Sequence, residues 1–174
     1  MKKQIMIIDG YNVIGNWPEL AQLKEQNQLA KARDRLLEIL TEYRRYTEAE
    51  ITVVFDAMYV PGITQRYDHY NLEVVFTQQD ETADSYIEKL ASKVNNHLIQ
   101  LTVVTSDQAE QWTVFSRGAL RISSREFGQE IQRVRQEVKN DTKQFRKMNS
   151  HYKLQTFSNQ QMLLLEKMRD ELSK

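Results

Sequence analysis

Four short apolar runs, each followed by acidic side chains, constrain the fold of this chain more than any other feature. The runs cover residues 4–8, 51–55, 72–76 and 101–105, and they are rich in the β-branched and aromatic residues of buried strands. The acids at or soon after their ends are Asp9, then Asp56, then Asp80, Glu81 and Asp84, and finally Asp107. If the runs are parallel strands, their carboxyl ends lie on one edge of a sheet, and acids far apart in sequence converge there.

Helix-like patterns alternate with these runs. Apolar residues recur at helical spacing over residues 28–46, 82–96, 125–147 and 159–172, and a shorter fifth strand-like run covers residues 119–122. Thr82 and Ser124 are candidate N-caps for the second and third of these helices. The alternation predicts an α/β fold with a central parallel sheet of about five strands and helices on both faces.

Composition excludes several classes of protein. The chain has 174 residues, no cysteine and three histidines, so disulfides and thiolate metal sites are impossible and a His-rich zinc site is disfavoured. No glycine-rich nucleotide-binding motif is present. The apolar stretch after Lys2 and Lys3 is interrupted by Asp9, which is too early for a signal peptide, and no run is long enough to span a membrane. We therefore expect a cytoplasmic protein.

The strand-end acids predict a metal site. Clustered carboxylates repel one another unless a cation lies among them, and sites made only of oxygen ligands favour Mg²⁺ or Mn²⁺. Asp84 precedes Ile87 by three residues and Ala91 by seven, which places it on the inward stripe of its helix. A partly buried carboxylate in that position needs a partner such as a metal ion. The pattern is typical of a metal-dependent phosphodiester-cleaving site.

Each acid also has a simpler interpretation. Asp9 before Gly10 could only shape a turn, Asp56 could form a turn, and Asp107 could cap a following helix. Asp84 could only complement the dipole of its helix. Asp80 and Glu81 could be metal ligands or solvated turn residues. Asn12 could orient a carboxylate, contact phosphate or shape the turn after Gly10.

Basic residues gather in the C-terminal third. Residues 117–174 carry a net charge of +6, and residues 1–116 carry −6. One helical ridge recurs every four residues: Arg135, Lys139, Lys143 and Lys147. The long connection over residues 57–71 adds cations and aromatic rings, including Arg66 and Tyr67, which is how proteins hold single-stranded nucleic acid. The alternative for both groups is an ordinary solvated surface.

Taken together, these residues resemble the YacP-like branch of the NYN domain family, relatives of PIN-domain nucleases. The matching segments are residues 7–14, 53–57, 81–88 and 103–107, together with residues 124–127, and the resemblance spans roughly residues 3–140. It implies a three-layer PIN-like fold, with Asp9, Asp84 and Asp107 as the metal-binding core and Asn12 and Asp56 close by. Some relatives carry glycine where this chain has Glu81, so the role of Glu81 stays open.

The resemblance also implies a function. We expect a single NYN/PIN-like domain over residues 1–174, with a C-terminal helical extension over residues 148–174. Its expected activity is Mg²⁺- or Mn²⁺-dependent endoribonuclease cleavage of single-stranded RNA by a metal-activated water. The branch is associated with bacterial mRNA decay, including cleavage on translating ribosomes.

Two other functions remain open at the level of sequence. The first is a non-catalytic RNA- or ribosome-binding module with the same fold. The second is a phosphatase of the haloacid dehalogenase type, which also begins with a strand-end aspartate. That enzyme class needs a second aspartate two residues later, and Tyr11 occupies that position here.

Overall fold

The structure is a computed structural model that describes residues 2–59, 70–94, 96–108, 118–156 and 159–172. The chain forms two compact units, Met1–Val134 and Arg135–Lys174, which we describe separately. Within the described residues, no helix is both long enough and apolar enough to span a membrane.

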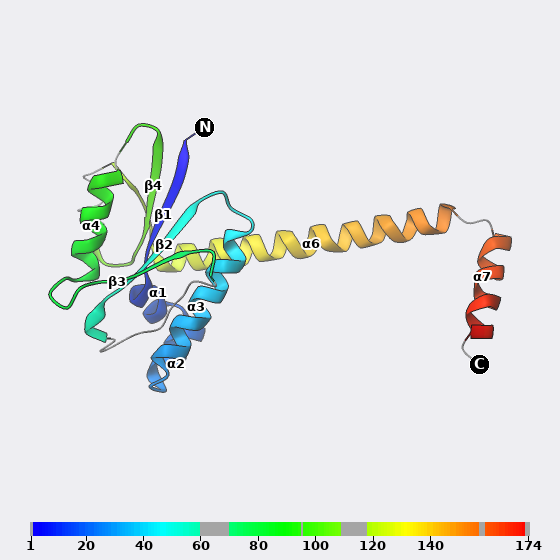
Figure 1. Cartoon of the computed structure of the whole chain (residues 1–174), viewed down its shortest axis with the longest axis horizontal. Helices are drawn as coiled ribbons and strands as arrows, with labels where there is room; N and C mark the ends of the chain where they lie inside the picture. The colour runs from blue at the N-terminus through cyan, green and yellow to red at the C-terminus, as the bar shows by residue number, and fades with distance from the viewer. Residues whose placement is uncertain (1, 60–69, 95, 109–117, 157–158, 173–174) are drawn as a thin grey trace. The chain divides into compact units, whose positions relative to one another are not determined.

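A five-stranded sheet forms the centre of the first unit (Figure 1). Its strands, in chain order, are β1 (Lys3–Asp9), β2 (Glu50–Phe55), β3 (Glu73–Phe76), β4 (Ile99–Val104) and β5 (Leu120–Ile122). Their spatial order is β3-β2-β1-β4-β5, and every pairing is parallel. The predicted α/β fold is therefore confirmed. The strand order reverses between β1 and β4, which is where sheets of this kind place their ligands.

Helices cover both faces of this sheet. One face packs against α1 (Gly10–Asn16), α2 (Pro18–Glu25), α3 (Leu29–Arg44) and the start of α6 (Ser124–Thr156). The other face packs against α4 (Ala83–Val94), drawn in green in Figure 1. A short 3₁₀ turn (Ala57–Tyr59) follows β2, and α7 (Asn159–Leu172) lies in the second unit. The sequence predicted α3, α4, α6 and α7 but missed α1 and α2.

The pleat of the strands divides the core in two. Ile8 and Val53 pack with the helices on the α3 face, whereas Ile7 and Val54 pack with α4. All four side chains are fully buried. Strands buried on both faces read as continuous apolar runs, which is why the sequence revealed them.

The helix caps partly follow the prediction. Thr82 caps α4, because its hydroxyl oxygen accepts a hydrogen bond from the Ser85 N–H at 3.2 Å. The predicted cap of α6 was one residue off. Ser123 Oγ accepts from the Glu126 N–H at 3.2 Å, and Glu126 Oε2 accepts from the Ser123 N–H at 2.9 Å, which is a capping box. The helix therefore begins at Ser124, and it continues to Thr156, beyond the predicted end at residue 147.

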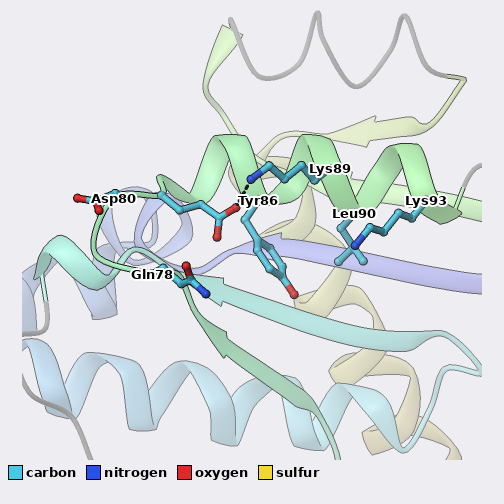
Figure 2. A pocket seen from close by; sticks show the side chains of 7 residues that line it. Gln78, Asp80, Tyr86, Lys89, Leu90 and Lys93 are labelled. Carbon is cyan, nitrogen blue, oxygen red and sulfur yellow. Dashed lines mark hydrogen bonds and ion pairs between the residues drawn. The ribbon is translucent and has the colours of Figure 1, made fainter.

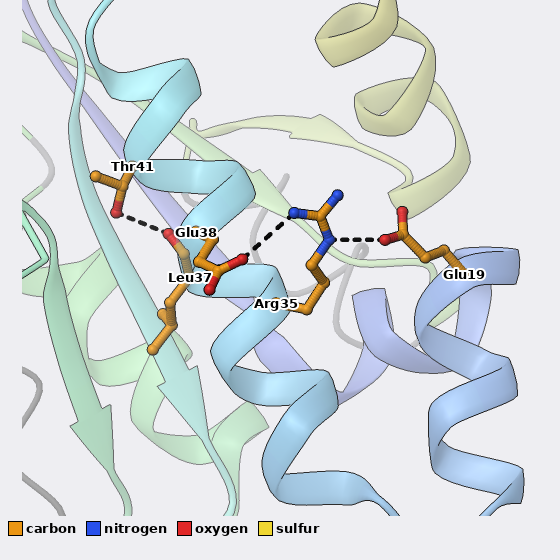
Figure 3. A network of polar contacts seen from close by, with 5 residues as sticks. All are labelled: Glu19, Arg35, Leu37, Glu38 and Thr41. Atoms are coloured by element: carbon orange, nitrogen blue, oxygen red, sulfur yellow. Dashed lines mark hydrogen bonds and ion pairs between the residues drawn. The ribbon is translucent and has the colours of Figure 1, made fainter.

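A surface ion-pair network joins α2 to α3 (Figure 3). Arg35 donates to Glu19 at 2.7 Å and to Glu38 at 3.3 Å. Because these side chains are well exposed, such pairs contribute at most about 1 kcal/mol each. The packing of α3 therefore depends mainly on its buried leucines.

Gly10 starts α1 directly beside an aromatic ring. A Cβ atom at this position would lie 2.3 Å from Phe55 Cε1. That ring packs against the rings of Tyr11 and Phe76, whose centroids lie 5.1 and 5.4 Å from its own. Glycine is thus required by the close approach of helix to strand, which is a stronger reason than the turn proposed from sequence.

We predict that Gly10→Ala destabilises the fold by roughly 1–3 kcal/mol, because the new methyl group overpacks a ring that has no room to move. Urea unfolding measures the change. Gly15→Ala, in the same helix, is the matched control, since the nearest atom to its added Cβ is the flexible Lys24 Nζ at 4.0 Å. It should be neutral or stabilising by up to about 1 kcal/mol. Equal effects of the two substitutions would contradict the packing argument.

Candidate metal and active site

Asp9 ends β1 on the face of the sheet that α4 covers. Side chains alternate along a strand, so Asp9 points to the same face as Ile7, and Asp56 to the same face as Val54. Asp9 is only 8% exposed. Its Oδ1 accepts a hydrogen bond from the Asn12 N–H at 3.2 Å, which makes Asp9 the N-cap of α1. The carboxylate thus has a structural role as well as a position at the switch point of the sheet.

The carboxyl groups at this edge act on one another electrostatically. Burial raises the pKa of Asp9 to about 6, the Asn12 hydrogen bond opposes this rise, and the charges of Asp84, Asp107 and Asp56 add to it. The charges of acids from three other segments therefore act on Asp9, and their assembly into one metal site stays a prediction. Ionising Asp9 among them is costly.

Asp84 lies in the first turn of α4. Sequence periodicity predicted an inward-facing, partly buried side chain, but the residue is exposed by surface area. Ile87 and Ala91 of that stripe are buried, whereas Asp84 lies at the start of the stripe, in the first turn of α4. Desolvation by nearby atoms still raises the pKa of its carboxyl group, with Asp107 and Asp56 adding to the rise.

Asp56 joins the end of β2 to the start of α4. Its Oδ1 accepts from the Met58 N–H at 2.8 Å, and its Oδ2 accepts from the Ala83 N–H at 3.4 Å. These bonds anchor the helix turn that carries Asp84. A role for Asp56 as a metal ligand stays a prediction.

Asp107 follows β4 and is exposed, and its N–H donates to Thr105 Oγ1 at 3.2 Å. Among the described residues, no three acidic or histidine side chains form a group arranged to hold a metal ion. The donor chemistry nevertheless fits Mg²⁺ or Mn²⁺, because every candidate ligand offers carboxylate oxygens and a divalent cation would relieve their repulsion.

Glu81 has a different partner from the other acids. Its Oε1 accepts a hydrogen bond from Lys89 Nζ at 2.7 Å, and the two side chains form an ion pair. Glu81 is not among the groups that raise the pKa of Asp9. Asp80 is exposed and borders the same neighbouring pocket as Glu81. A ligand role for Glu81 stays a prediction, and it would require this ion pair to open.

Asn12 connects three segments of this edge. Its Oδ1 accepts from the Ser106 N–H at 2.8 Å and from Ser124 Oγ at 2.7 Å. Ser124 N–H in turn donates to Ser106 Oγ at 3.1 Å. The amide therefore ties the start of α1 to the loop bearing Asp107 and to the start of α6. Sequence reasoning missed the role of Ser124, although this residue follows a strand as the acids do.

The other predicted RNA-contacting residues fall outside the described residues or in the second unit. Arg66 and Tyr67 fall outside the described residues. Arg135, Lys139 and Lys143 belong to the second unit, where Lys139 and Lys143 are exposed and Arg135 is half-buried. Their role in binding RNA stays a prediction.

Comparisons with known proteins agree on one family. The family described as "YacP-like NYN domain" matches residues 6–170. The chain is 45% identical over 134 residues to the uncharacterized protein YacP of Bacillus subtilis (strain 168), covering 77% of this chain and 78% of the relative. The family match extends to residue 170, well past residue 140, where the resemblance found in the sequence ends.

Solved structures give the same result. The crystal structure of Rae1 (YacP) from Bacillus subtilis is similar with a TM-score of 0.73 and 39% identity, covering 95% of this chain and 94% of that one. A single-substitution mutant of Rae1 (YacP) from the same organism matches with a TM-score of 0.70 and 40% identity, over 81% and 82% of the two chains.

The raised pKa of Asp9 predicts a pH dependence of stability. Its folded pKa of about 6 lies above the ordinary value of 3.8, so the folded state binds more protons between these values, and stability falls as pH rises through them. In the absence of divalent ions, wild-type protein should lose on the order of 2–3 kcal/mol from this group between pH 4 and pH 7. Urea unfolding of Asp9→Asn at several pH values should show this loss removed. Identical pH profiles for the two proteins would show that Asp9 ionises normally.

Proposed function

This chain belongs to the YacP-like NYN domain family, and from that premise we propose that it is a metal-dependent endoribonuclease acting on single-stranded RNA. Family membership supports a nuclease-type, PIN-like domain. The observation that carries the finer proposal is that Asp9 ends β1 and Asp84 lies in the first turn of α4, and that desolvation and the charge of Asp107 raise the pKa of both carboxyl groups. A surface that gathers carboxylates disfavours a polyanion unless a cation intervenes, which argues against a purely RNA-binding module.

The acids would hold the ion, and the rest of the edge would position them. Asp9, Asp84 and Asp107 are the proposed ligands, with Asp56 beside them. When bound, Mg²⁺ or Mn²⁺ supplies an activated water and neutralises charge on the leaving oxygen. Asp9 must be ionised to serve as a ligand, so its raised pKa predicts metal affinity that increases as pH rises through about 6.

Asn12 is suited to contact the substrate as well as to position the site. Its Oδ1 is occupied by Ser106 and Ser124, so the amide orientation is fixed by a backbone donor. Its Nδ2 has no hydrogen-bond acceptor among the described residues and could donate to a phosphate oxygen. The proposed substrate is mRNA, with cleavage on the ribosome as the expected setting in the cytoplasm.

The metal proposal predicts both binding and cleavage. Mn²⁺ should raise the thermal midpoint of the wild-type protein, because a ligand that binds only the folded state stabilises it by about 2.7 kcal/mol at one hundred times its Kd. Mn²⁺ should also be required for endonucleolytic cleavage of a fluorescent single-stranded RNA. Asp84→Asn should abolish cleavage and remove most of the Mn²⁺-induced shift, with little loss of stability in metal-free buffer.

The matched control is Glu48→Gln, an exposed acid just before β2 and so at the opposite edge of the sheet. It should keep both the Mn²⁺ shift and cleavage. Cleavage by Asp84→Asn at the wild-type rate would contradict the assignment of Asp84 as a metal ligand. Unfolding of this variant would show that Asp84 has a structural role.

The basic ridge of α6 generates a separate prediction. Lys139 and Lys143 are exposed on one helical face, and each phosphate contact on single strands contributes a slope of roughly −0.7 to the salt dependence of binding. Changing both to Gln should flatten that slope by roughly 1 to 1.5 units and weaken RNA affinity. Cleavage at saturating RNA should survive. Unchanged affinity and slope would make the ridge a solvated helix face.

A further inference from the structure

A pocket of about 460 Å³ lies along one flank of α4, beside the acidic edge (Figure 2). Its volume is in the range of small-ligand sites. Tyr86, Leu90 and Lys93 line it at helical positions i, i+4 and i+7, so they share one flank of the helix. Ile87 and Ala91, on the adjacent stripe, are buried in the core. The pocket is thus formed by a face of α4 that the sheet leaves uncovered.

The two ends of the pocket carry opposite charges. Gln78 and Asp80 lie at one end and Lys93 at the other, with the ring of Tyr86 between them (Figure 2), and Glu81 also lines the pocket. Glu81 is already paired with Lys89 at 2.7 Å. Lys93 is exposed and has no ion-pair partner among the described residues. One aromatic face and one available cation therefore remain.

We propose that this pocket binds one nucleotide of the RNA strand next to the cleavage site. The base would stack on Tyr86 and pack against Leu90, and a backbone phosphate would contact Lys93. Stacking on an aromatic ring together with a nearby cation is how proteins hold single strands. The proposal rests on the proposed nuclease function, because it assigns a neighbouring subsite for the same substrate.

The geometry of α4 supports this assignment. Asp84 and Tyr86 lie in the first turn of the same helix, so the subsite begins next to the proposed ligand. Lys93 lies nine residues after Asp84, which is roughly 14 Å along the helix axis. A short stretch of extended single strand spans that distance. The strand would leave the acidic edge along α4, towards the cation and away from the other carboxylates.

The acidic end of the pocket predicts a base preference. Glu81 Oε2 has no hydrogen-bond partner among the described residues, and the Gln78 amide lines the same pocket. Carboxylates accept from the exocyclic amine of cytosine, and amides pair with adenine. The subsite should therefore favour a base with an exocyclic amino group over uracil.

The test measures RNA binding and cleavage with three variants. Tyr86→Leu keeps an apolar side chain but removes the stacking face, Tyr86→Phe keeps that face, and Lys93→Gln removes the cation. The probes are fluorescent RNA decamers of adenine or uracil, bound in EDTA and cleaved in Mn²⁺. Lys31→Gln, an exposed lysine on α3, is the control. Thermal midpoints establish that each variant is folded.

We expect Tyr86→Leu to weaken binding of the adenine decamer by about tenfold, within the range for loss of one stacked base, whereas Tyr86→Phe stays near wild type. Lys93→Gln should flatten the salt slope by roughly 0.7. Tyr86→Leu and Lys93→Gln should each raise the KM for RNA cleavage with little change in kcat. Lys31→Gln should change nothing.

Failure of this proposal is distinguishable from failure of the nuclease function. If wild-type protein cleaves RNA but Tyr86→Leu and Lys93→Gln keep wild-type affinity and KM, only the subsite is overturned. If kcat falls instead of KM rising, the residues act on the ligands of the edge and the subsite is again overturned. If wild-type protein neither binds nor cleaves RNA, both proposals fall together.

Discussion

The alternation of side chains along β1 and β2 determines where the acids of this protein meet. Ile7 and Val54 point into the core beneath α4, so Asp9 and Asp56, two residues later, point to the same side at the edge where α4 begins. A shift of one residue in the register of either strand would turn its acid to the α3 face of the sheet. The candidate site therefore depends on the same register that fills the core, and neither can change without the other.

Gathering acids at this edge lowers the stability of the folded protein. Asp9 is buried, and its pKa is raised by that burial and by the charges of three other carboxylates. The surrounding bonds make this arrangement possible: the Asn12 N–H supports Asp9, the Ala83 N–H supports Asp56, and Ser124 holds Asn12 in place. Such conflict between local charge and stability is expected where a protein keeps a group ready for a ligand.

Much of the fold could be predicted from the sequence, because doubly buried strands leave uninterrupted apolar runs whose ends are easy to find. Helices α1 and α2 could not, since each spans only 7 or 8 residues and Gly10, Gly15 and Pro18 interrupt the pattern. The sequence also predicted that the acids gather at one edge, because parallel strands all end on the same side of a sheet. The exposure of Asp84, the cap at Ser123 and the contacts of Asn12 depend on how separate loops meet in space, and spacing along the chain does not contain that information.

The two outer strands of the sheet, β3 and β5, have four and three residues, whereas the central strands have six or seven. Each outer strand offers only a brief row of backbone groups to a strand from another chain. The β3 margin also carries Glu73, which is held by the Thr52 hydroxyl at 2.9 Å and places a charge on the border. Short, charged borders discourage the edge-to-edge pairing that begins aggregation. A flat parallel sheet with longer outer strands would expose more unpaired backbone groups to a second copy of the chain.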